Sequence, residues 1–348
     1  MHIPDGILDA KTAAATAGMA FVGLTVALRH ASRTLPKHKV PLLGLTAAFV
    51  FAAQMLNFPV GFGTSGHLVG AVLTAALLGP SAAVIVIAAV LIVQCFMFAD
   101  GGISALGANI FNMGLIGGVA GWAIYYSVSR MFKGLFGCIL GAAFAAWCST
   151  VLAAIACAGE LATSHTFAWN AVFPAMAGIH ALIGAGEGLI TAMVLSAMAQ
   201  THPELVLKPQ SATPAPSHRP LPAYGPLAAY GTVIALGLAL FVSPFASQSP
   251  DGLDKTTQSL GAQSHASQLF PALMPDYTIQ SLSTLQTSVS IAGAFGTLVV
   301  FALSWLLART LVPTPRSTKT HSQQSDDPPL AHPNHLPAPS TTMPPAPR

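Results

Sequence analysis

The sequence predicts an all-α integral membrane protein, built as a bundle of seven helices followed by a two-helix transmembrane hairpin. Only 7% of the 348 residues are charged and 53% are hydrophobic, whereas a soluble protein has roughly 25% charged residues. Nine apolar runs follow one another along the chain. The basic residues between them are distributed as the positive-inside rule requires.

The nine runs are rich in Ala, Leu, Val and Gly, as packed membrane helices are. They lie at about 12–28, 40–56, 67–78, 80–99, 105–128, 134–158, 176–199, 222–243 and 287–308. The third run is shorter than the roughly 20 apolar residues of a full crossing, which leaves a re-entrant segment as an alternative.

Charge favours a crossing for this short run. One basic loop, 29–39, follows the first run and another, 130–133, follows the fifth. Because basic loops lie in the cytoplasm, an even number of crossings must separate them, so the third run counts as one. The N-terminus is then outside and the C-terminus cytoplasmic, and only Lys11 and Lys255 of the 14 Lys and Arg residues lie outside.

The chain is expected to divide into four parts. A membrane domain at 1–200 is followed by a Pro-, Ser- and Thr-rich cytoplasmic linker at 201–221. The second domain, 222–312, is the hairpin, with an extracytoplasmic segment of about forty residues between its helices. The tail at 313–348 is expected to be disordered.

Several function classes are disfavoured. The net charge of +3 is small and scattered, which argues against nucleic acid as a partner. The sequence has no G-x-x-x-x-G-K-[ST] phosphate loop, so any ATP hydrolysis belongs to another chain. The four cysteines lie in apolar runs without metal-type spacing and are expected to be buried free thiols: Cys95, Cys138, Cys148 and Cys157.

The N-terminus offers a metal chelate. No basic start precedes an apolar signal core, so we expect Met1 to be retained with a free amine. This amine, the His2 amide nitrogen and the His2 ring nitrogen can close fused small chelate rings around one ion, and a fourth nitrogen would complete a plane. A nitrogen plane favours Ni(II) or Cu(II) over Zn(II). Pro4-Asp5-Gly6 can turn the segment back onto the protein; the alternative is an ordinary disordered terminus.

His67 is the candidate for the fourth nitrogen. It lies on the same side as Met1 in the predicted topology, at the start of the short third helix, with Ser65 as a plausible helix cap. The alternative hypothesis is that His67 only packs against neighbouring helices.

Further polar residues lie within or beside the apolar runs, where they are costly unless they face the protein interior. They are Gln94, Asp100, Asn109, Asn112, His180 and Glu187. Asp100 lies in an outer loop, and Asn109 and Asn112 share a helix face, where they either orient a ligand or bond between helices. His180 and Glu187 are two helical turns apart, so an acid–base pair is an alternative role for them.

Four segments carry a resemblance to a known family. They are Met1-His2-Ile3-Pro4-Asp5-Gly6, Ser65-Gly66-His67-Leu68, residues 99–113 and residues 184–191. Over about residues 1–200 the chain resembles the CbiM/NikM family, the substrate-capture (S) components of energy-coupling factor importers for cobalt or nickel. The later segment Pro250-Asp251-Gly252-Leu253-Asp254 resembles the PDGLE domain, a NikN-like unit, with aspartate in place of the final glutamate.

This resemblance implies a transport subunit and not an enzyme. Its cargo would be Ni(II) or Co(II), held by Met1, His2 and His67, with no resident cofactor, and Asp5 and the polar residues named above would support the site or helix packing. The implied partners are a transmembrane scaffold protein and ABC ATPase subunits in the bacterial cytoplasmic (inner) membrane, with lipid around the chain. Two alternatives stay open: an S component for an organic micronutrient, and a metal-dependent membrane enzyme using His180 and Glu187.

Overall fold

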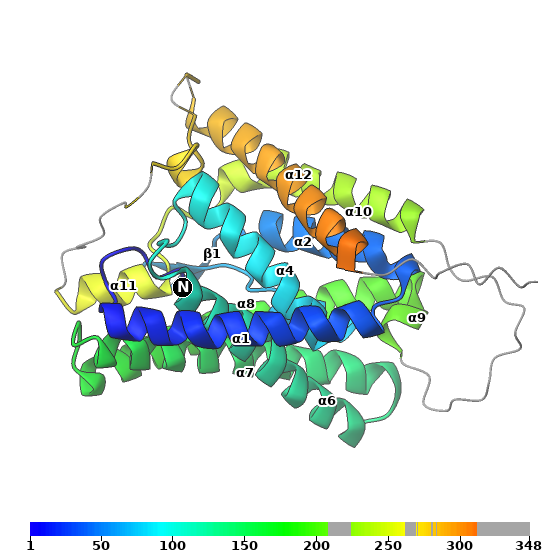
Figure 1. The fold of residues 1–348 in the computed structure, drawn as a ribbon, viewed down its shortest axis with the longest axis horizontal. Coiled ribbons are helices and arrows are strands. Elements are labelled where there is room, and N and C mark those ends of the chain that lie inside the picture. Colours follow the sequence, from blue (N-terminus) through cyan, green and yellow to red (C-terminus); the bar gives the residue numbers. More distant parts are fainter. Residues whose placement is uncertain (208–223, 262–268, 270, 280, 283, 312–348) are drawn as a thin grey trace, which may run out of the picture. The chain divides into compact units, whose positions relative to one another are not determined.

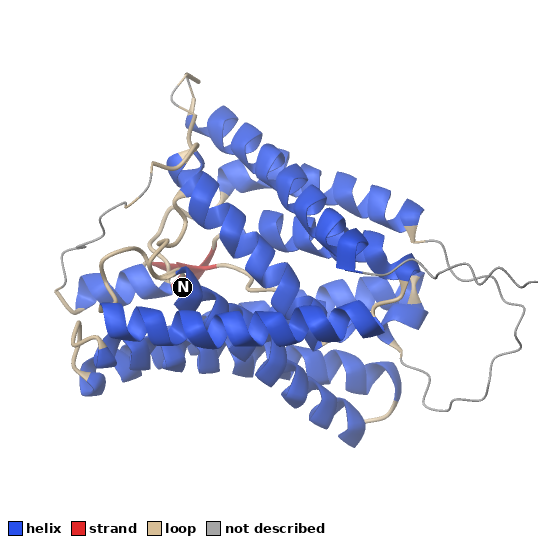
Figure 2. Cartoon of the chain, in the orientation of Figure 1, coloured by secondary structure: helices blue, strands red, loops and turns tan. Residues whose placement is uncertain are grey.

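A computed structural model describes residues 1–207, 224–261, 269, 271–279, 281–282 and 284–311, all within one compact unit that ends at Pro313. Within these residues the regular secondary structure is helical apart from one small sheet (Figures 1 and 2). The expected disordered tail and most of the expected linker lie outside the described residues.

The first 207 residues form the larger part of this unit. Its helices are α1 (Ala10–Thr34), α2 (Val40–Gln54), α3 (Ala71–Leu78), α4 (Pro80–Val93), α5 (Leu106–Asn109), α6 (Gly121–Met131), α7 (Gly134–Thr163), α8 (Trp169–Thr201) and α9 (Pro203–Val206). A 3₁₀ turn, Lys37–Lys39, precedes α2, and π-helical segments extend α4 (Gln94–Phe98) and join α5 to α6 (Ile110–Ala120).

Burial follows the distribution of apolar residues. Apart from its first two residues and Ile92, every residue of α4 is buried, and the helix contacts α1, α2, α3 and α12. By contrast, α1 buries only Thr16, Ala20, Ala27 and Ala31. Small residues on one stripe let a membrane helix approach its neighbours closely, while its larger side chains face outward.

The third apolar run differs from the expectation. Its helix α3 has only 8 residues, and the residues before it form an antiparallel hairpin of β1 (Phe58–Gly61) and β2 (Thr64–Gly66), with Phe58 opposite Gly66. The sequence did not predict this sheet. Since an eight-residue helix rises only about 12 Å, α3 alone cannot cross a bilayer.

The C-terminal part is a helical hairpin that packs on α2. It comprises α10 (Gly225–Gly237), a π-helical extension (Leu238–Val242), a 3₁₀ turn (Ser243–Phe245), α11 (Gly252–Ser259), a second 3₁₀ turn (Pro275–Tyr277) and α12 (Leu285–Leu311). Both α10 and α12 contact α2, as Figure 1 shows. The predicted transmembrane hairpin is therefore seen as two helices with an intervening segment.

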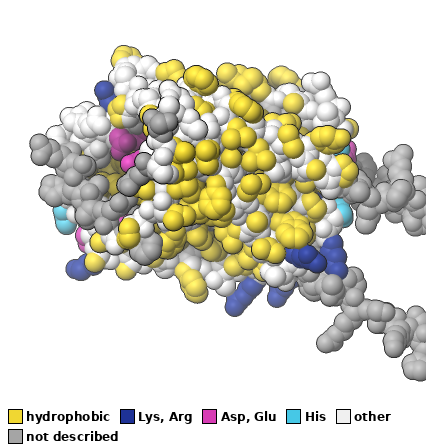
Figure 3. Space-filling model, turned by 90° about the horizontal axis from the view of Figure 1, so that it is seen from above, with side chains coloured by type: hydrophobic (Ala, Val, Ile, Leu, Met, Phe, Trp, Pro, Cys, Tyr) yellow, Lys and Arg dark blue, Asp and Glu magenta, His cyan; other side chains and the backbone are white. Residues whose placement is uncertain are grey.

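Seven described helices are long and apolar enough to cross a membrane, against nine expected crossings. The two that fall short are α2 and α3. Figure 3 shows hydrophobic side chains covering the middle of one face, with Lys and Arg gathered mostly toward one end. The chain is a multi-pass membrane protein. The four cysteines are free as expected, although Cys138 and Cys148 are only half-buried.

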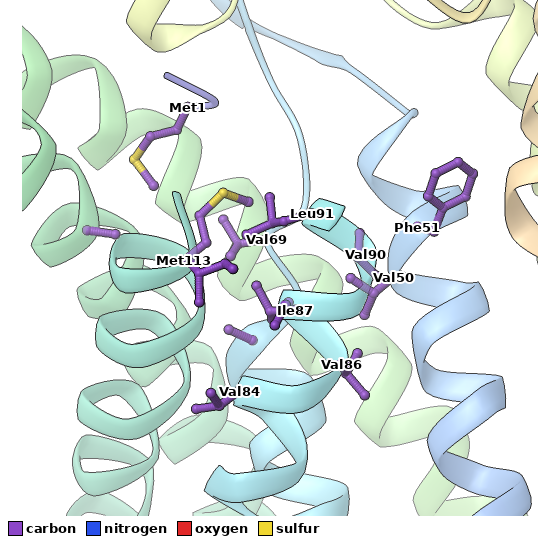
Figure 4. Close-up of a cluster of buried hydrophobic side chains, with 14 of the residues drawn as sticks. Met1, Val50, Phe51, Val69, Val84, Val86, Ile87, Val90, Leu91 and Met113 are labelled. Atoms are coloured by element: carbon purple, nitrogen blue, oxygen red, sulfur yellow. The ribbon is translucent and has the colours of Figure 1, made fainter. Parts of the chain in front are cut away.

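The loops that the charge pattern places on opposite sides of the membrane lie at opposite ends of the bundle. At one end Leu42, Leu205 and Tyr224 form a small apolar cluster. At the other end the N-terminus lies beside β1, as Figure 1 shows. Met1 joins the main hydrophobic core there, near Val69 and Met113 (Figure 4).

Candidate metal centre

The N-terminal segment is held inside the protein by Asn109, from α5. The main-chain N–H of Ile3 donates to Asn109 Oδ1 at 2.8 Å, and Asn109 Nδ2 donates back to the Ile3 carbonyl at 3.1 Å. The Gly102 N–H donates to the same carbonyl at 2.9 Å. Because Ile3 is fully buried, these bonds satisfy main-chain groups that water cannot reach. Asn109 therefore holds the N-terminal segment in place and does not only bond between two helices.

A turn on each side makes this close approach possible. Gly102 packs so tightly that a Cβ there would lie 2.2 Å from the Asp5 nitrogen. The predicted turn at Pro4-Asp5-Gly6 is present, with Gly6 at φ 85°. Asp5 Oδ1 accepts from the Ser104 N–H at 2.7 Å and from its hydroxyl at 2.6 Å. Asp5 thus ties the turn to the loop after α4.

The Met1 amine and His67 meet at the end of this segment. The amine donates to His67 Nε2 at 3.4 Å, and both residues are buried. His67 Nδ1 donates to the Leu68 carbonyl at 3.2 Å, which leaves the lone pair of Nε2 facing the amine. Burial and the neighbouring positive charges lower the pKa of His67 to about 3. The ring is therefore neutral at physiological pH, the state that a metal ligand needs.

His67 does not open the third helix, as the sequence had suggested. It lies in the extended segment between β2 and α3, whose cap is Gly70. Ser65 is not a helix cap either. It is part of β2, where its N–H donates to the Pro250 carbonyl at 2.9 Å and its hydroxyl to the Ser249 carbonyl at 2.7 Å. The C-terminal hairpin thus docks on the strand that leads to His67.

His2 lies beside His67 but is held by Asp100. The two histidine rings pack edge-to-face, with centroids 5.2 Å apart. His2 Nδ1 lies 2.5 Å from Asp100 Oδ1, and the Tyr277 hydroxyl donates to the other carboxylate oxygen at 2.7 Å. Burial raises the pKa of Asp100, but His2 and Tyr277 lower it further, to about 2. An ionised carboxylate therefore orients the His2 ring.

Asp251 is the second carboxylate at the terminus, and it comes from the C-terminal hairpin. Its Oδ2 accepts from the Met1 amine in an ion pair, while its Oδ1 accepts from the N–H groups of Leu253 and Asp254, capping α11. Burial lowers the pKa of the amine, but the charge and hydrogen bond of Asp251 raise it by more, so the net shift is upward from the ordinary value of an N-terminal amine. The amine is therefore protonated at neutral pH.

Four of the predicted polar residues have hydrogen-bond partners other than the nitrogens of Met1, His2 and His67: Gln94, Asn112, His180 and Glu187. Glu187 accepts from the N–H groups of Val69 and Gly70 at 2.5 and 2.9 Å, where α3 begins. Asn112 donates to Glu160 at 2.7 Å, and Gln94 lies 3.5 Å from the Tyr277 hydroxyl. His180 has a different partner from Glu187: its Nδ1 donates to the Met176 carbonyl at 2.8 Å. No acid–base pair of His180 and Glu187 is formed.

The donor set is a cluster of nitrogens surrounded by carboxylates. Among the described residues no group of three or more His, Cys, Asp and Glu side chains is placed to hold a metal. A site made of Met1, His2 and His67 is not a group of this kind, because two of its four donors are main-chain nitrogens and not side-chain atoms. The amine and His2 Nδ1, which would bind the ion, each contact a carboxylate here. Two of the candidate ligand nitrogens are thus engaged by carboxylates in this structure.

Sequence reasoning missed two residues of this cluster, Asp251 and Tyr277. The Pro-Asp-Gly turn at 250–252 repeats the turn at 4–6, but a turn tripeptide recurs too readily to indicate contact with a distant amine. Tyr277 had no local signal, since the segment around it has neither a motif nor a clear periodicity. Both contacts depend on how the hairpin packs against the bundle.

Comparison with known proteins gives two family matches. Residues 2–205 match the CbiM family, described as a cobalt uptake substrate-specific transmembrane region. Residues 225–312 match the PDGLE domain. The two matches correspond to the two helical parts described above.

Relatives and solved structures agree. A protein from Archaeoglobus fulgidus, named as a putative fused nickel transport protein, NikMN, is 36% identical over 89% of this chain and 98% of its own length. The fused nickel transport protein NikMN of Rhodobacter capsulatus is 36% identical over 62% of this chain and 66% of its own length. A crystal structure of a truncated transition metal transporter superposes with a TM-score of 0.53 at 34% identity, covering 58% of this chain and 100% of that one.

Proposed function

Since the chain belongs to the CbiM family and carries a PDGLE domain after it, we propose that it captures Ni(II) or Co(II) for an energy-coupling factor importer. The family makes it a transport protein and not an enzyme. One observation carries the proposal: the Met1 amine, His2 and His67 gather in one buried cluster although 66 positions separate the first from the last. The ligands would be that amine, the His2 amide and ring nitrogens, and His67 Nε2.

Charge at the cluster supports this ligand set. Binding removes one proton from the amine and one from the His2 amide, because nitrogen ligands must be deprotonated. A divalent ion bound to the amide anion leaves a net charge of +1, which equals the charge of the ammonium group that it replaces. Asp251 therefore faces the same charge before and after binding, and its carboxylate needs no new partner.

The size of the site favours an ion over an organic molecule. The cavity beside Met1 and His67 measures about 10 Å³, whereas pockets for organic ligands measure roughly 300–1,000 Å³. An S component for an organic micronutrient therefore finds no support here. The Glu187 carboxylate is occupied by the two main-chain N–H groups just before α3, and it likewise gives no support to a metal-dependent enzyme.

We further propose the orientation and division of the chain. The N-terminal cluster faces outside and the C-terminus lies in the cytoplasm, because the loops at 29–39 and 130–133 carry the basic residues. The capture domain is 1–200, the linker 201–221, the PDGLE-like hairpin 222–312 and the cytoplasmic tail 313–348. The metal would be captured outside and released inside when partner ATPases act on a shared transmembrane scaffold.

An insertion at the N-terminus tests the ligand set. One leucine between Met1 and His2 moves the imidazole out of the small chelate without removing any side chain, and a second residue of this size keeps the initiator methionine in place. The affinity of the purified full chain for Ni(II) and Co(II) should fall by more than the roughly 10- to 100-fold that loss of an outer partner costs. One leucine inserted within 201–221 is the control and should leave both affinities unchanged. Equal affinity of the wild type and the N-terminal insertion would overturn the proposal.

A further inference from the structure

A small cavity adjoins the proposed metal plane on the side of α8. It measures about 10 Å³ and is lined by Met1, His67, Thr150, His180 and Asp251, among others. This volume is about what one water molecule needs. A buried water also requires two to four polar partners. The amine, the carboxylate and the histidine provide them.

His180 has an unused nitrogen in this region. Its side chain is only 2% exposed, and Nδ1 lies 2.8 Å from the Met176 carbonyl, so Nδ1 carries the hydrogen. Nε2 then has a free lone pair, and it has no hydrogen-bond partner among the described residues. A buried acceptor without a partner is uncommon and implies a donor such as ordered water.

The direction of Nε2 follows from Gly252. A Cβ on this glycine would lie 2.6 Å from His180 Cε1 and 2.8 Å from Nε2, so this edge of the ring faces the glycine. Gly252 lines the same cavity and follows Asp251, whose carboxylate pairs with Met1. The unpaired nitrogen is therefore aimed at the cavity beside the metal plane.

We propose that His180 Nε2 and the Asp251 carboxylate hold one water in this cavity, and that this water is the axial ligand of the captured metal. The inference rests on the proposed function, in which four nitrogens occupy the plane. Any fifth donor must then approach along the axis. The water donates one hydrogen to Nε2 and the other to Asp251, which leaves its lone pair for the ion.

An axial water distinguishes the two candidate metals. Low-spin Ni(II) has a filled orbital along the axis of a nitrogen plane and gains little from a fifth ligand, whereas Co(II) has one electron fewer and accepts one. His180 therefore favours Co(II) relative to Ni(II). Loss of one hydrogen bond of about 1 kcal/mol corresponds to about a fivefold change in the ratio of the two affinities.

Spectroscopy of the cobalt-loaded full chain tests the axial ligand. The unpaired electron of low-spin Co(II) lies along the axis, so electron paramagnetic resonance reports the axial atom directly. We expect an oxygen ligand, seen as line broadening in ¹⁷O-enriched water, and no nitrogen hyperfine splitting along the axis. A nitrogen splitting would mean that His180 binds the metal itself, and absence of ¹⁷O broadening would mean that no water does. Either result overturns the inference, and neither requires a variant.

Two substitutions at His180 then test its part. H180Q keeps an acceptor near the position of Nε2, and H180L removes it at similar volume. H180L should abolish the ¹⁷O effect and lower the Co(II)-to-Ni(II) affinity ratio by about fivefold, whereas H180Q should retain both. The exposed His165 provides the control, because H165L should change neither.

The outcomes separate this inference from the proposed function. An unchanged spectrum of H180L at full cobalt occupancy overturns the inference alone. A ¹⁷O effect that is lost in D251N but kept in H180L overturns it too, since Asp251 alone would then hold the water. A wild-type chain with a free Met1 amine that binds neither cobalt nor nickel overturns the proposed function, and this inference with it.

Discussion

Asn109→Ala should release the N-terminal segment from the protein interior. Asn109 makes two hydrogen bonds to the buried Ile3 main chain, at 2.8 and 3.1 Å. Each is worth about 0.5–1.5 kcal/mol, and an orphaned buried N–H adds to the loss, so the docked terminus is destabilised by about 1.5–4 kcal/mol. The hydrogen bond from the Gly102 N–H to the Ile3 carbonyl remains in the variant. It keeps that carbonyl paired, which accounts for the lower end of this range.

Metal affinity should fall by up to the same free energy. Only a docked terminus places the Met1 amine beside His67, so the apparent affinity falls with the docked fraction, by up to about 1,000-fold. Competition titration of nickel and cobalt against a chelator of known affinity measures this on the purified full chain.

Asn112→Ala is the matched control. Asn112 is buried on the same helical stretch and donates to Glu160 at 2.7 Å, without touching the terminus. Its loss should lower the stability of the fold by a similar amount but leave metal affinity within about twofold. Equal metal affinity in Asn109→Ala and the wild type, or equal losses in both variants, would refute the assigned role of Asn109.

Three other residues can be tested through single contacts. In Asp251→Asn the pKa of the Met1 amine should fall, because burial then acts without the carboxylate that raises this pKa. Calorimetry in buffers of different ionisation enthalpy should show fewer protons released on metal binding at pH 7, and equal proton release would contradict this. Glu187→Gln should lower the free energy of unfolding by about 1–3 kcal/mol in a proteolysis assay, because one of the two main-chain N–H groups just before α3 loses its acceptor. Wild-type stability of the variant would show that Glu187 does not stabilise this segment. Gly102→Ala places a Cβ 2.2 Å from the Asp5 nitrogen, and metal affinity should fall at least about tenfold in the same chelator titration. Unchanged affinity would show that the terminus docks without this close approach.

The membrane class and most helices could be predicted from the sequence because they depend on local composition. Runs such as 134–158 and 287–308 coincide with α7 and α12, within a few residues at each end. The segment before α3 could not be predicted in this way. Its short strands pair locally and with Pro250 of the distant hairpin, and the short apolar run that follows is compatible with either a helix or a re-entrant loop.

The candidate cluster could be predicted in part, for similar reasons. The nitrogens of Met1, His2 and His67, and the side on which the charge pattern places them, predict that these residues associate, and the structure brings them together. The carboxylate partners of the cluster depend on tertiary packing. Asp251 reaches the amine only because the hairpin docks on β2, and no local pattern encodes a contact between positions 1 and 251.

The proposed metal site requires a free Met1 amine. The most direct test of this requirement is the nickel and cobalt content and affinity of the purified full chain, with an unmodified Met1 confirmed by mass spectrometry, compared with the same chain after selective acetylation of that amine. The free-amine chain should bind one ion per molecule, and the acetylated chain should lose this binding although every side chain is unchanged. Equal metal content and affinity in the two forms would contradict the account.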